Sequence, residues 1–399
     1  MFRPYVRLLR VPGAALPALA SFVGALPIGM LTLSVLLFVR SSTGSFALAG
    51  AVSGALTAGN AIGLLLQGRL IDRYGQPRVL VPTGLACLGS LVLLVISARA
   101  PLSWLMLLAF VAGACIPAVL SCMRVLWPEL VAERDRRDTA YAMLSMQFQV
   151  ALILGPLVVS ALLLVARPAV AVLVAGVMAG GAGILFAATP ASRRWQPPKR
   201  SRTRRGSNAG ARTLLVGGVL AGLSAGLLAV GIPAAAVATG TASFAGVLFA
   251  ALSAGELVGG AAYGAKAWRT PHVRRLLGAQ LLGTGALLLA AAAAGWPLAL
   301  LAALAVLGLV LTPAAISSSA LLDDVAQAGS LTQAYTSIVA ASLVGAAAGN
   351  ALGGWIVAQF APWTPFAVAA VTLAVAALWT ASRRFSLQLS RTAGSSTDA

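Results

Sequence analysis

The chain has 399 residues, of which 59% are hydrophobic and 9% are charged, and its mean hydropathy is +0.93. Soluble globular domains carry about 25% charged residues, so this composition excludes a soluble enzyme, a disordered chain and a secreted disulfide-rich scaffold. It indicates a polytopic membrane protein. The net charge of +19 comes from short basic clusters without a nucleic-acid recognition motif. The three cysteines lack metal-ligand spacing. We therefore predict no nucleic-acid partner, no metal and no cofactor.

Twelve apolar runs are each long enough to cross a bilayer, which takes about 20 residues of helix. They are rich in Leu and Ala and show no period-2 alternation, which favours helices over barrel strands. Basic residues precede the first run, which its length identifies as a membrane helix rather than a cleaved signal peptide. The predicted spans are 14–39, 46–68, 79–98, 102–126, 139–166, 169–189, 213–238, 241–264, 274–294, 297–321, 334–360 and 364–382.

A polar segment divides these spans into six and six. Residues 190–212 contain eight Lys or Arg, several Pro and Gly residues and no acidic residue, a composition typical of a flexible linker. The predicted organisation is an N-terminal six-helix bundle over 1–189, a basic linker over 190–212, and a C-terminal six-helix bundle with a short tail over 213–399.

The basic residues are distributed unevenly between the two ends of the spans. With a cytoplasmic N-terminus, twenty-five Lys and Arg fall in cytoplasmic segments, and only Arg40, Arg99 and Arg167 fall in the opposite loops. Cytoplasmic loops of membrane proteins carry an excess of Lys and Arg. This asymmetry therefore predicts that both termini and the linker are cytoplasmic, in a multi-pass protein of the plasma membrane.

The two halves resemble each other at a nearly constant offset. An offset of 194 positions aligns Gly155 with Gly349. Because each half has an even number of spans, the repeats run in the same sense through the membrane, which predicts two bundles with a cavity between them. An offset of 196 positions aligns Gly59, Asn60, Gly63, Gly68 and Arg78 with Gly255, Glu256, Gly259, Gly264 and Arg274.

The stretch GRLIDRYGQPRVL, from Gly68 to Leu80, lies between the second and third predicted spans. It closely resembles the signature loop of the major facilitator superfamily, G-x-L-x-D-R-x-G-R-x-x-x-L. Gln76 stands where a basic residue is common, and Arg78 supplies a charge nearby. The resemblance implies an all-α integral membrane fold of twelve helices in two six-helix bundles related by pseudo-two-fold symmetry. The matching positions are Gly68, Leu70, Asp72, Arg73, Gly75 and Leu80.

This loop is expected to act in conformational switching. Gly68 and Gly75 are predicted to permit a tight turn and close helix approach. The resemblance implies that Asp72 and Arg73, with Arg78 nearby, form a cytoplasmic latch that favours the outward-facing state. The equivalent loop of the second half has Trp268 in place of the acid, so one latch is expected.

Two other signatures are degraded. The fourth span has Ala109 where the family often has an arginine four residues before a glycine. Drug antiporters of the superfamily carry G-x-x-x-G-P-x-x-G-G in the fifth span, where this chain keeps Gly155 and Pro156 alone. These two residues are predicted to kink the fifth helix.

Polar groups inside the hydrocarbon region are few and mark the predicted site, because a central charge costs about 2.5–3.5 kcal/mol. Glu256 is the only acidic residue predicted inside the membrane, about 12 Å from the cytoplasmic boundary. Low-polarity surroundings favour a protonated carboxyl group, so Glu256 is the predicted proton-coupling residue; the alternative is a carboxyl held neutral for helix packing. The residues predicted to line the substrate cavity, or alternatively to form interhelical hydrogen bonds, are Asn60, Gln147, Gln149, Tyr263 and Asn350.

No enzyme motif is present in the sequence, neither a phosphate-binding loop nor a metalloprotease helix. The leading hypothesis is a monomeric secondary active transporter that works by alternating access and exports a small apolar or cationic amphipathic compound in exchange for protons. One alternative is a proton-coupled uptake carrier for a small metabolite. The other is a transport-inactive membrane sensor or scaffold.

Overall fold

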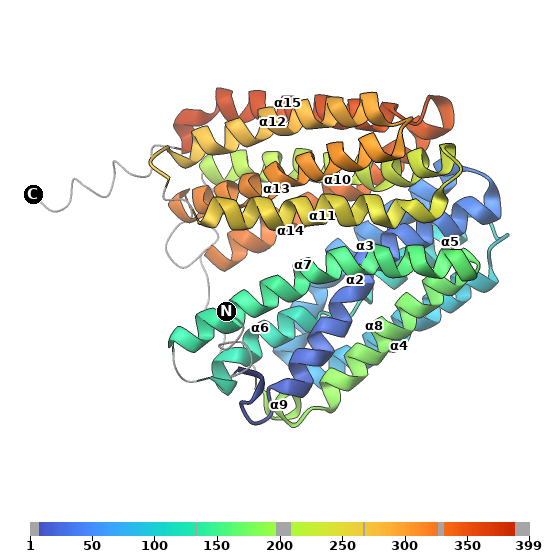
Figure 1. Cartoon of the computed structure of the whole chain (residues 1–399). Coiled ribbons are helices and arrows are strands. Elements are labelled where there is room, and N and C mark those ends of the chain that lie inside the picture. The colour runs from blue at the N-terminus through green and yellow to red at the C-terminus, as the bar shows by residue number, and fades with distance from the viewer. Residues whose placement is uncertain (1–7, 132–133, 197–208, 266–267, 326–330, 388–399) are drawn as a thin grey trace, which may run out of the picture. The chain divides into compact units, whose positions relative to one another are not determined.

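The computed structural model describes residues 8–131, 134–196, 209–265, 268–325 and 331–387, and these residues are almost entirely helical. The chain divides into two compact units, residues 1–200 and 201–399. Figure 1 shows the helices of both units. Unit 1 contains α2 (Ala15–Thr43), α3 (Phe46–Tyr74), α4 (Gln76–Ile96), α5 (Leu102–Ala114), α6 (Val119–Leu130), α7 (Arg134–Val165), α8 (Pro168–Ala188) and the short α9 (Pro190–Arg194). Unit 2 contains α10 (Ala209–Ala238), η1 (Ala242–Phe244), α11 (Ala245–Gly264), α12 (His272–Ala293), α13 (Pro297–Val325), α14 (Leu331–Gln359), α15 (Thr364–Ser382) and η2 (Arg384–Leu387).

Twelve spans in the described residues are long and apolar enough to cross a membrane, and each overlaps one of the predicted runs. The prediction of a twelve-helix membrane fold is therefore confirmed. The helix ends follow local chemistry. Gly44 closes α2 in the left-handed conformation, with its N–H donating to the Arg40 carbonyl, and the Ser45 hydroxyl accepts from the Leu48 N–H at the start of α3.

The fourth span differs from its prediction as one helix over 102–126. It consists of α5 and α6, separated by residues 115–118. Pro117 lies in this interruption, and a proline has no N–H to donate and disfavours helical backbone in the residue before it. In unit 2 the corresponding α13 is continuous and contains Pro313.

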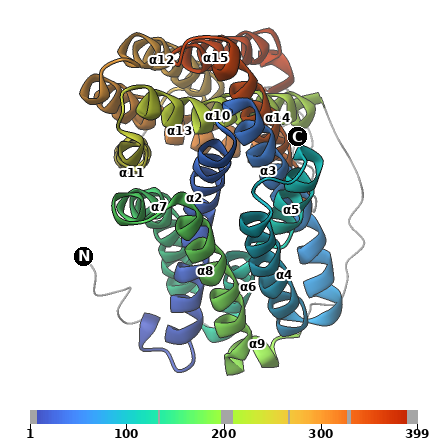
Figure 2. The ribbon, with the colours of Figure 1, turned by 90° about the vertical axis from the view of Figure 1, so that its right-hand side faces the viewer.

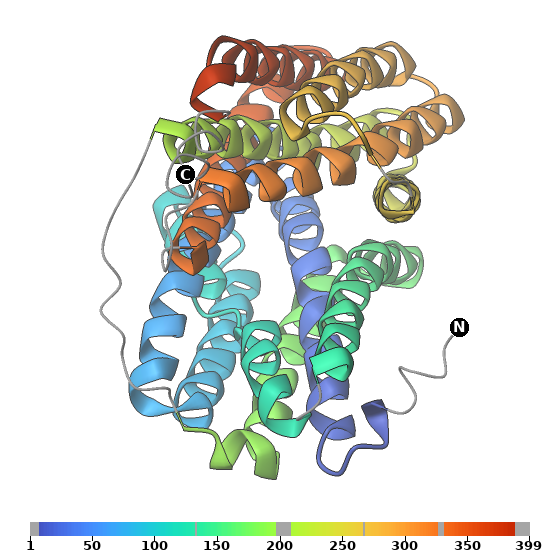
Figure 3. The same ribbon diagram turned by 90° about the vertical axis from the view of Figure 1, so that its left-hand side faces the viewer.

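The two units repeat the same set of helix contacts. In unit 1 the extensive pairings are α2 with α3, α7 and α8, α4 with α5 and α8, and α3 with α5; the pairing of α2 with α3 is the one without an equally extensive counterpart in unit 2. In unit 2 they are α10 with α14 and α15, α12 with α13 and α15, and α11 with α13. Figures 2 and 3 show one member of this set, α12 beside α15. The sequence repeat is therefore also a repeat of helix packing.

Each unit is packed from its own helices. In unit 1, Met123, Trp127 and Phe186 are fully buried in a cluster that includes Leu80 and Val119. In unit 2, the end that contains η2 is closed by a leucine cluster, formed by Leu214, Leu276, Leu321, Leu322 and Leu387 with Val273.

Candidate functional site

The signature segment is mostly helical and not a loop. Helix α3 continues to Tyr74, six residues past its predicted end, and α4 begins at Gln76. The turn is therefore the single residue Gly75, whose φ of +84° is one that residues with a Cβ rarely adopt. Asp72 and Arg78 are exposed on either side of this turn.

The prediction that Gly68 permits a tight turn and a close helix contact was wrong within unit 1. Gly68 lies inside α3, about two turns before the chain reverses, and has no positive φ. A Cβ built there meets nothing within 4 Å. It therefore makes neither the tight turn nor a close helix contact in this unit, whereas Gly75 does make the turn.

The side chain of Gln67 forms hydrogen bonds with the backbone where the fourth span is interrupted. Its Nε2 donates to the carbonyl oxygens of Ala114 at 2.9 Å and Ile116 at 2.8 Å, and its Oε1 accepts from the Ala118 N–H at 3.0 Å. The side chain is 2% exposed. Helix ends leave backbone groups without partners, and one buried amide supplies both donor and acceptor here. This function of Gln67 was not predicted from the sequence.

Gln147 connects α7 to α2. Its Nε2 donates to the Ala18 carbonyl oxygen at 3.2 Å, and its Oε1 accepts from the Ser21 hydroxyl at 3.1 Å. In the structure both atoms of this amide are used in helix packing. Gln149, two residues further on, is half-buried.

Asn60 and Glu256 occupy equivalent positions in the two units. A Cβ added to Gly113 of α5 would overlap the Leu56 carbonyl oxygen and lie 3.0 Å from the Asn60 backbone nitrogen. In unit 2 a Cβ added to Gly308 would overlap the Leu252 carbonyl oxygen and lie 2.7 Å from the Glu256 nitrogen. Both side chains are half-buried. The offset of 196 found in the sequence thus relates residues with the same packing environment.

The fifth and eleventh spans repeat in the same way. A Cβ at Gly155 would lie 3.0 Å from the Leu26 carbonyl oxygen of α2, so this glycine lets α7 approach α2 closely. Helix α7 runs without interruption through Gly155 and Pro156. In unit 2, Asn350 is 1% exposed in α14, and its backbone nitrogen lies 2.7 Å from a Cβ built on Gly226 of α10.

Tyr263 belongs to an aromatic and basic cluster between α11 and α12. Its hydroxyl lies 3.0 Å from the Ser317 hydroxyl and accepts from Arg275 Nη1 at 2.6 Å. Its ring stacks on Trp268 with ring centroids 5.0 Å apart. Arg275 Nη2 donates to Nδ1 of His272 at 2.8 Å, and its guanidinium lies over both aromatic rings.

This cluster occupies the place where unit 1 has the signature segment. The offset of 196 aligns Trp268 with Asp72 and His272 with Gln76. The sequence analysis predicted the loss of the acidic residue but missed the cluster that replaces it. The alternation of Tyr, Trp, His and Arg between positions 263 and 275 was the signal available for it.

The site chemistry is that of a membrane carrier. The described residues hold no group of three His, Cys, Asp or Glu side chains placed to bind a metal ion. What the candidate residues supply is amides and, in α11, the carboxyl group of Glu256. Together with the repeated bundles, this defines a twelve-helix transporter fold.

Comparison with known proteins specifies the class. The sequence matches the Major Facilitator Superfamily over residues 18–213. A search of curated protein sequences found no match. The superfamily match spans just under half of the chain, which is therefore similar to the major facilitator superfamily.

Solved structures agree on the fold over nearly the whole chain. The nucleoside transporter NupG superposes with a TM-score of 0.72 at 13% identity, covering 92% of this chain and 98% of that one. A bacterial homologue of the iron transporter ferroportin, in an inward-facing state, gives 0.74 at 13% identity, covering 94% and 98%. A bacterial homologue of the human lysosomal transporter Spinster gives 0.69 at 13% identity, covering 98% and 97%. At this identity the likeness concerns the fold.

Proposed function

We propose that this chain exports a small apolar or cationic amphipathic compound in exchange for protons, by alternating access, and that Glu256 is its protonation site. The observation that carries the proposal is the position of Glu256. It is the only charged residue of α11, a helix otherwise built from Gly, Ala, Leu, Val, Ser, Phe and Tyr.

A charge is costly in such an apolar helix. A carboxylate near the middle of the hydrocarbon region costs about 2.5–3.5 kcal/mol on insertion scales. A proton removes this cost by neutralising the group, and a bound cation removes it by pairing with the group. A carboxyl group that takes one or the other exchanges a proton for a cation, which is the coupling an antiporter needs.

The equivalence of Glu256 with Asn60 supports a function beyond packing. Both residues stand at a close glycine contact between helices, and in unit 1 an uncharged amide satisfies that position. Helix packing by itself therefore has no need of an acidic side chain there. At this position unit 2 differs from unit 1 in having the carboxyl group of Glu256 in place of the Asn60 amide.

The proposal also gives a function to the residues predicted to line the substrate cavity. Asn60, Gln149, Tyr263 and Asn350 supply hydrogen-bonding groups on otherwise apolar helices, and we propose that the substrate path is lined by such amides and apolar residues. Such a surface suits an apolar or cationic solute better than a phosphate or a dicarboxylate.

An uptake carrier for a small metabolite is the second candidate. The structural relatives include a nucleoside transporter and a homologue of an iron transporter, so the fold is compatible with solutes of very different chemistry. A transport-inactive sensor is the third. For all three we propose a plasma-membrane monomer with both termini and the linker in the cytoplasm, supported by the distribution of Lys and Arg.

The test uses purified protein in liposomes with an acidic interior and the fluorescent lipophilic cation ethidium outside. Wild type should accumulate ethidium as protons leave. Glu256→Gln should lose this gradient-driven accumulation, because the amide can neither release a proton nor pair with the cation. Glu256→Asp keeps the carboxyl group and serves as the matched control, with accumulation retained.

Two results would contradict the proposal. Equal accumulation by wild type and Glu256→Gln would move the proton site elsewhere. The absence of ethidium movement by folded wild type would exclude cation efflux and favour a neutral metabolite as substrate.

A further inference from the structure

Unit 2 contains a partly open cavity of about 230 Å³ that the transport proposal does not use. Five helices of this one unit surround it, α10, α12, α13, α14 and α15. It lies at the end of the unit that contains η2, and Leu387 of η2, 3% exposed, forms part of its wall. The cavity is therefore internal to one bundle.

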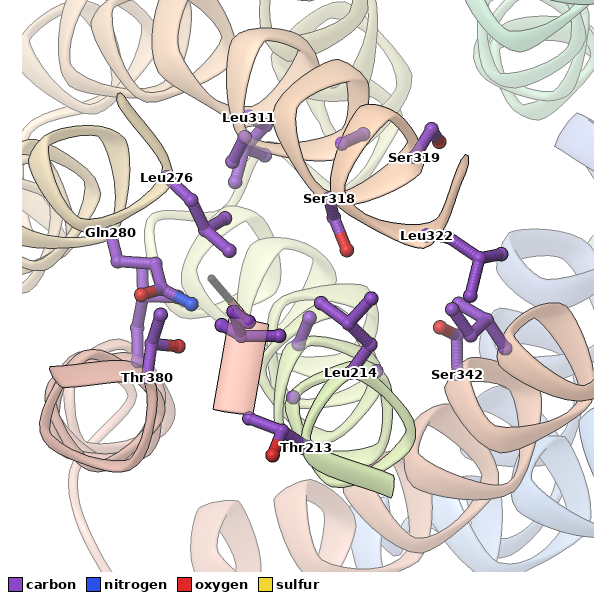
Figure 4. A pocket seen from close by; sticks show the side chains of 18 residues that line it. Thr213, Leu214, Leu276, Gln280, Leu311, Ser318, Ser319, Leu322, Ser342 and Thr380 are labelled. Atoms are coloured by element: carbon purple, nitrogen blue, oxygen red, sulfur yellow. The ribbon is translucent and has the colours of Figure 1, made fainter. Parts of the chain in front are cut away.

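The wall is mostly apolar. Leucines 214, 276, 311 and 322 project into the cavity from three different helices (Figure 4). The polar groups in the wall are hydroxyls and one amide, and none of the described residues that line the cavity is charged. A charged ligand would find no counter-charge here, so the wall selects a neutral one.

Gln280 is the polar group that points to a ligand. Its side chain is 6% exposed, and its Oε1 has no hydrogen-bond partner among the described residues. Figure 4 shows the amide at the wall with its nitrogen on the cavity side, and the Ser318 hydroxyl is directed into the cavity from α13. A half-turn of the terminal amide exchanges its two ends and brings the oxygen to the cavity side. A buried amide oxygen without a partner costs about 1–3 kcal/mol, so a ligand that donates a hydrogen bond to it recovers that cost.

We propose that this cavity binds one small neutral amphiphile, a molecule with an apolar body of about one ring and a single hydroxyl group that bonds to Gln280. The volume fixes the size class, because an apolar cavity of about 150 Å³ in another protein accepts benzene. A cavity of about 230 Å³ has room for a ring with a substituent. The amide fixes the polar end, since its oxygen accepts and its nitrogen donates.

The site also has a structural consequence within unit 2. The cavity separates the half of α13 that follows Pro313 from α10 and α14, and Leu322 and Ser318 of α13 face it. A bound molecule fills the space between these helices. The site is thus an accessory site inside one bundle, distinct from Glu256 on α11, which does not line the cavity.

The test measures binding of 4-fluorophenol and of fluorobenzene by fluorine NMR, using the full-length protein in lipid nanodiscs and empty nanodiscs as the baseline. Gln280→Leu removes the amide. Gly217→Leu fills the cavity, because Gly217 lines it and a Cβ there meets nothing within 4 Å. Gly278→Leu is the matched control, since Gly278 has the same open space but does not line the cavity.

Wild type and Gly278→Leu should bind 4-fluorophenol saturably and more tightly than fluorobenzene. Gln280→Leu should lower the affinity for 4-fluorophenol by about tenfold and abolish the preference for 4-fluorophenol over fluorobenzene, as expected for the loss of a buried hydrogen bond. Gly217→Leu should abolish binding of both.

Three results would overturn the proposal. One is partition into wild-type nanodiscs no different from empty ones, which would mean that water alone fills the cavity. Another is unchanged 4-fluorophenol binding in folded Gly217→Leu. The third, independent of whether Gly217→Leu folds, is an unchanged preference for 4-fluorophenol in Gln280→Leu.

Discussion

Gln67 and Tyr263 stand at equivalent positions of the two units, and the difference between them explains a difference in helix structure. Gln67 bonds to two carbonyl groups and one N–H around Pro117, where the fourth span is interrupted. Tyr263 bonds to the Ser317 hydroxyl of α13, which remains helical past Pro313. An amide can form hydrogen bonds with free backbone carbonyl groups and with free N–H groups. In a continuous helix these backbone groups are already bonded, so a phenol hydroxyl that bonds to a side chain is sufficient.

Replacement of Gln67 should therefore destabilise the protein more than replacement of Gln147. Gln67→Leu leaves two carbonyls and one N–H at a buried helix interruption without partners, which we expect to lower the free energy of unfolding by about 1–3 kcal/mol. Gln147→Leu removes one bond to the helical carbonyl of Ala18 and one to the Ser21 hydroxyl, so a loss of about 0.6 kcal/mol is expected. Thermal unfolding in detergent measures both. Equal losses would show that Gln67 does not support the interruption.

At the level of the helices, close glycine contacts determine how spans pair. In each of the pairs α3 with α5 and α11 with α13, three glycines lie directly on a backbone carbonyl of the partner helix. They are Gly59, Gly63 and Gly113 in the first pair and Gly255, Gly259 and Gly308 in the second. Membrane helices lack a hydrophobic driving force for association and depend on such close approach. The repeat of Gly113 and Gly308 on equivalent carbonyls indicates that the two units share one packing solution.

Alanine at either of these glycines should separate the paired helices. Gly113→Ala and Gly308→Ala each place a Cβ on a backbone oxygen that cannot rotate away, and we expect a loss of about 1–3 kcal/mol in each case. The controls are Gly89→Ala and Gly278→Ala, where a Cβ meets nothing within 4 Å. These should be neutral or slightly stabilising, because Ala favours helix over Gly by up to about 1 kcal/mol.

Unfolding temperature and yield of monodisperse protein measure these variants. Similar losses for Gly113→Ala and Gly308→Ala would agree with a shared packing solution. A loss at Gly89 or Gly278 as large as at the contact glycines would contradict the argument, because it would show that any added methyl group destabilises these helices.

For the whole molecule, the proposed alternating-access cycle requires the two units to change their relation, and the family resemblance connects the signature segment with that change. Asp72, Arg73 and Arg78 are exposed in unit 1, on both sides of the Gly75 turn. Their side chains contribute little to the packing of their own unit. A function in conformational switching would leave stability unchanged and alter the rate.

Asp72→Asn should accordingly slow transport without affecting folding. We expect the unfolding free energy to stay within about 0.5 kcal/mol of wild type, and the rate of gradient-driven transport to fall roughly five- to tenfold, the size of a typical coupling between conformational states. Arg69→Gln, an exposed charge one turn earlier in α3, is the control and should transport normally. Normal rates for Asp72→Asn would remove the latch from the mechanism.

The sequence by itself determined the twelve spans and the similarity of the two halves. Hydropathy is a local property, summed over about 20 residues. A turn with positive φ favours glycine, but the sequence did not distinguish Gly75 from Gly68. The alignment of Asn60 with Glu256 was also available from the sequence, because related halves keep their residues in order.

Only the tertiary structure decided what the polar side chains bond to. Gln67 reaches carbonyls 47 and 49 residues away, and Gln147 reaches Ala18 across 129 residues. The cavity around Gln280 likewise requires five helices to meet in space. A hydrogen-bond partner or an internal cavity depends on which helices pack together, and no periodicity within a single span contains that information.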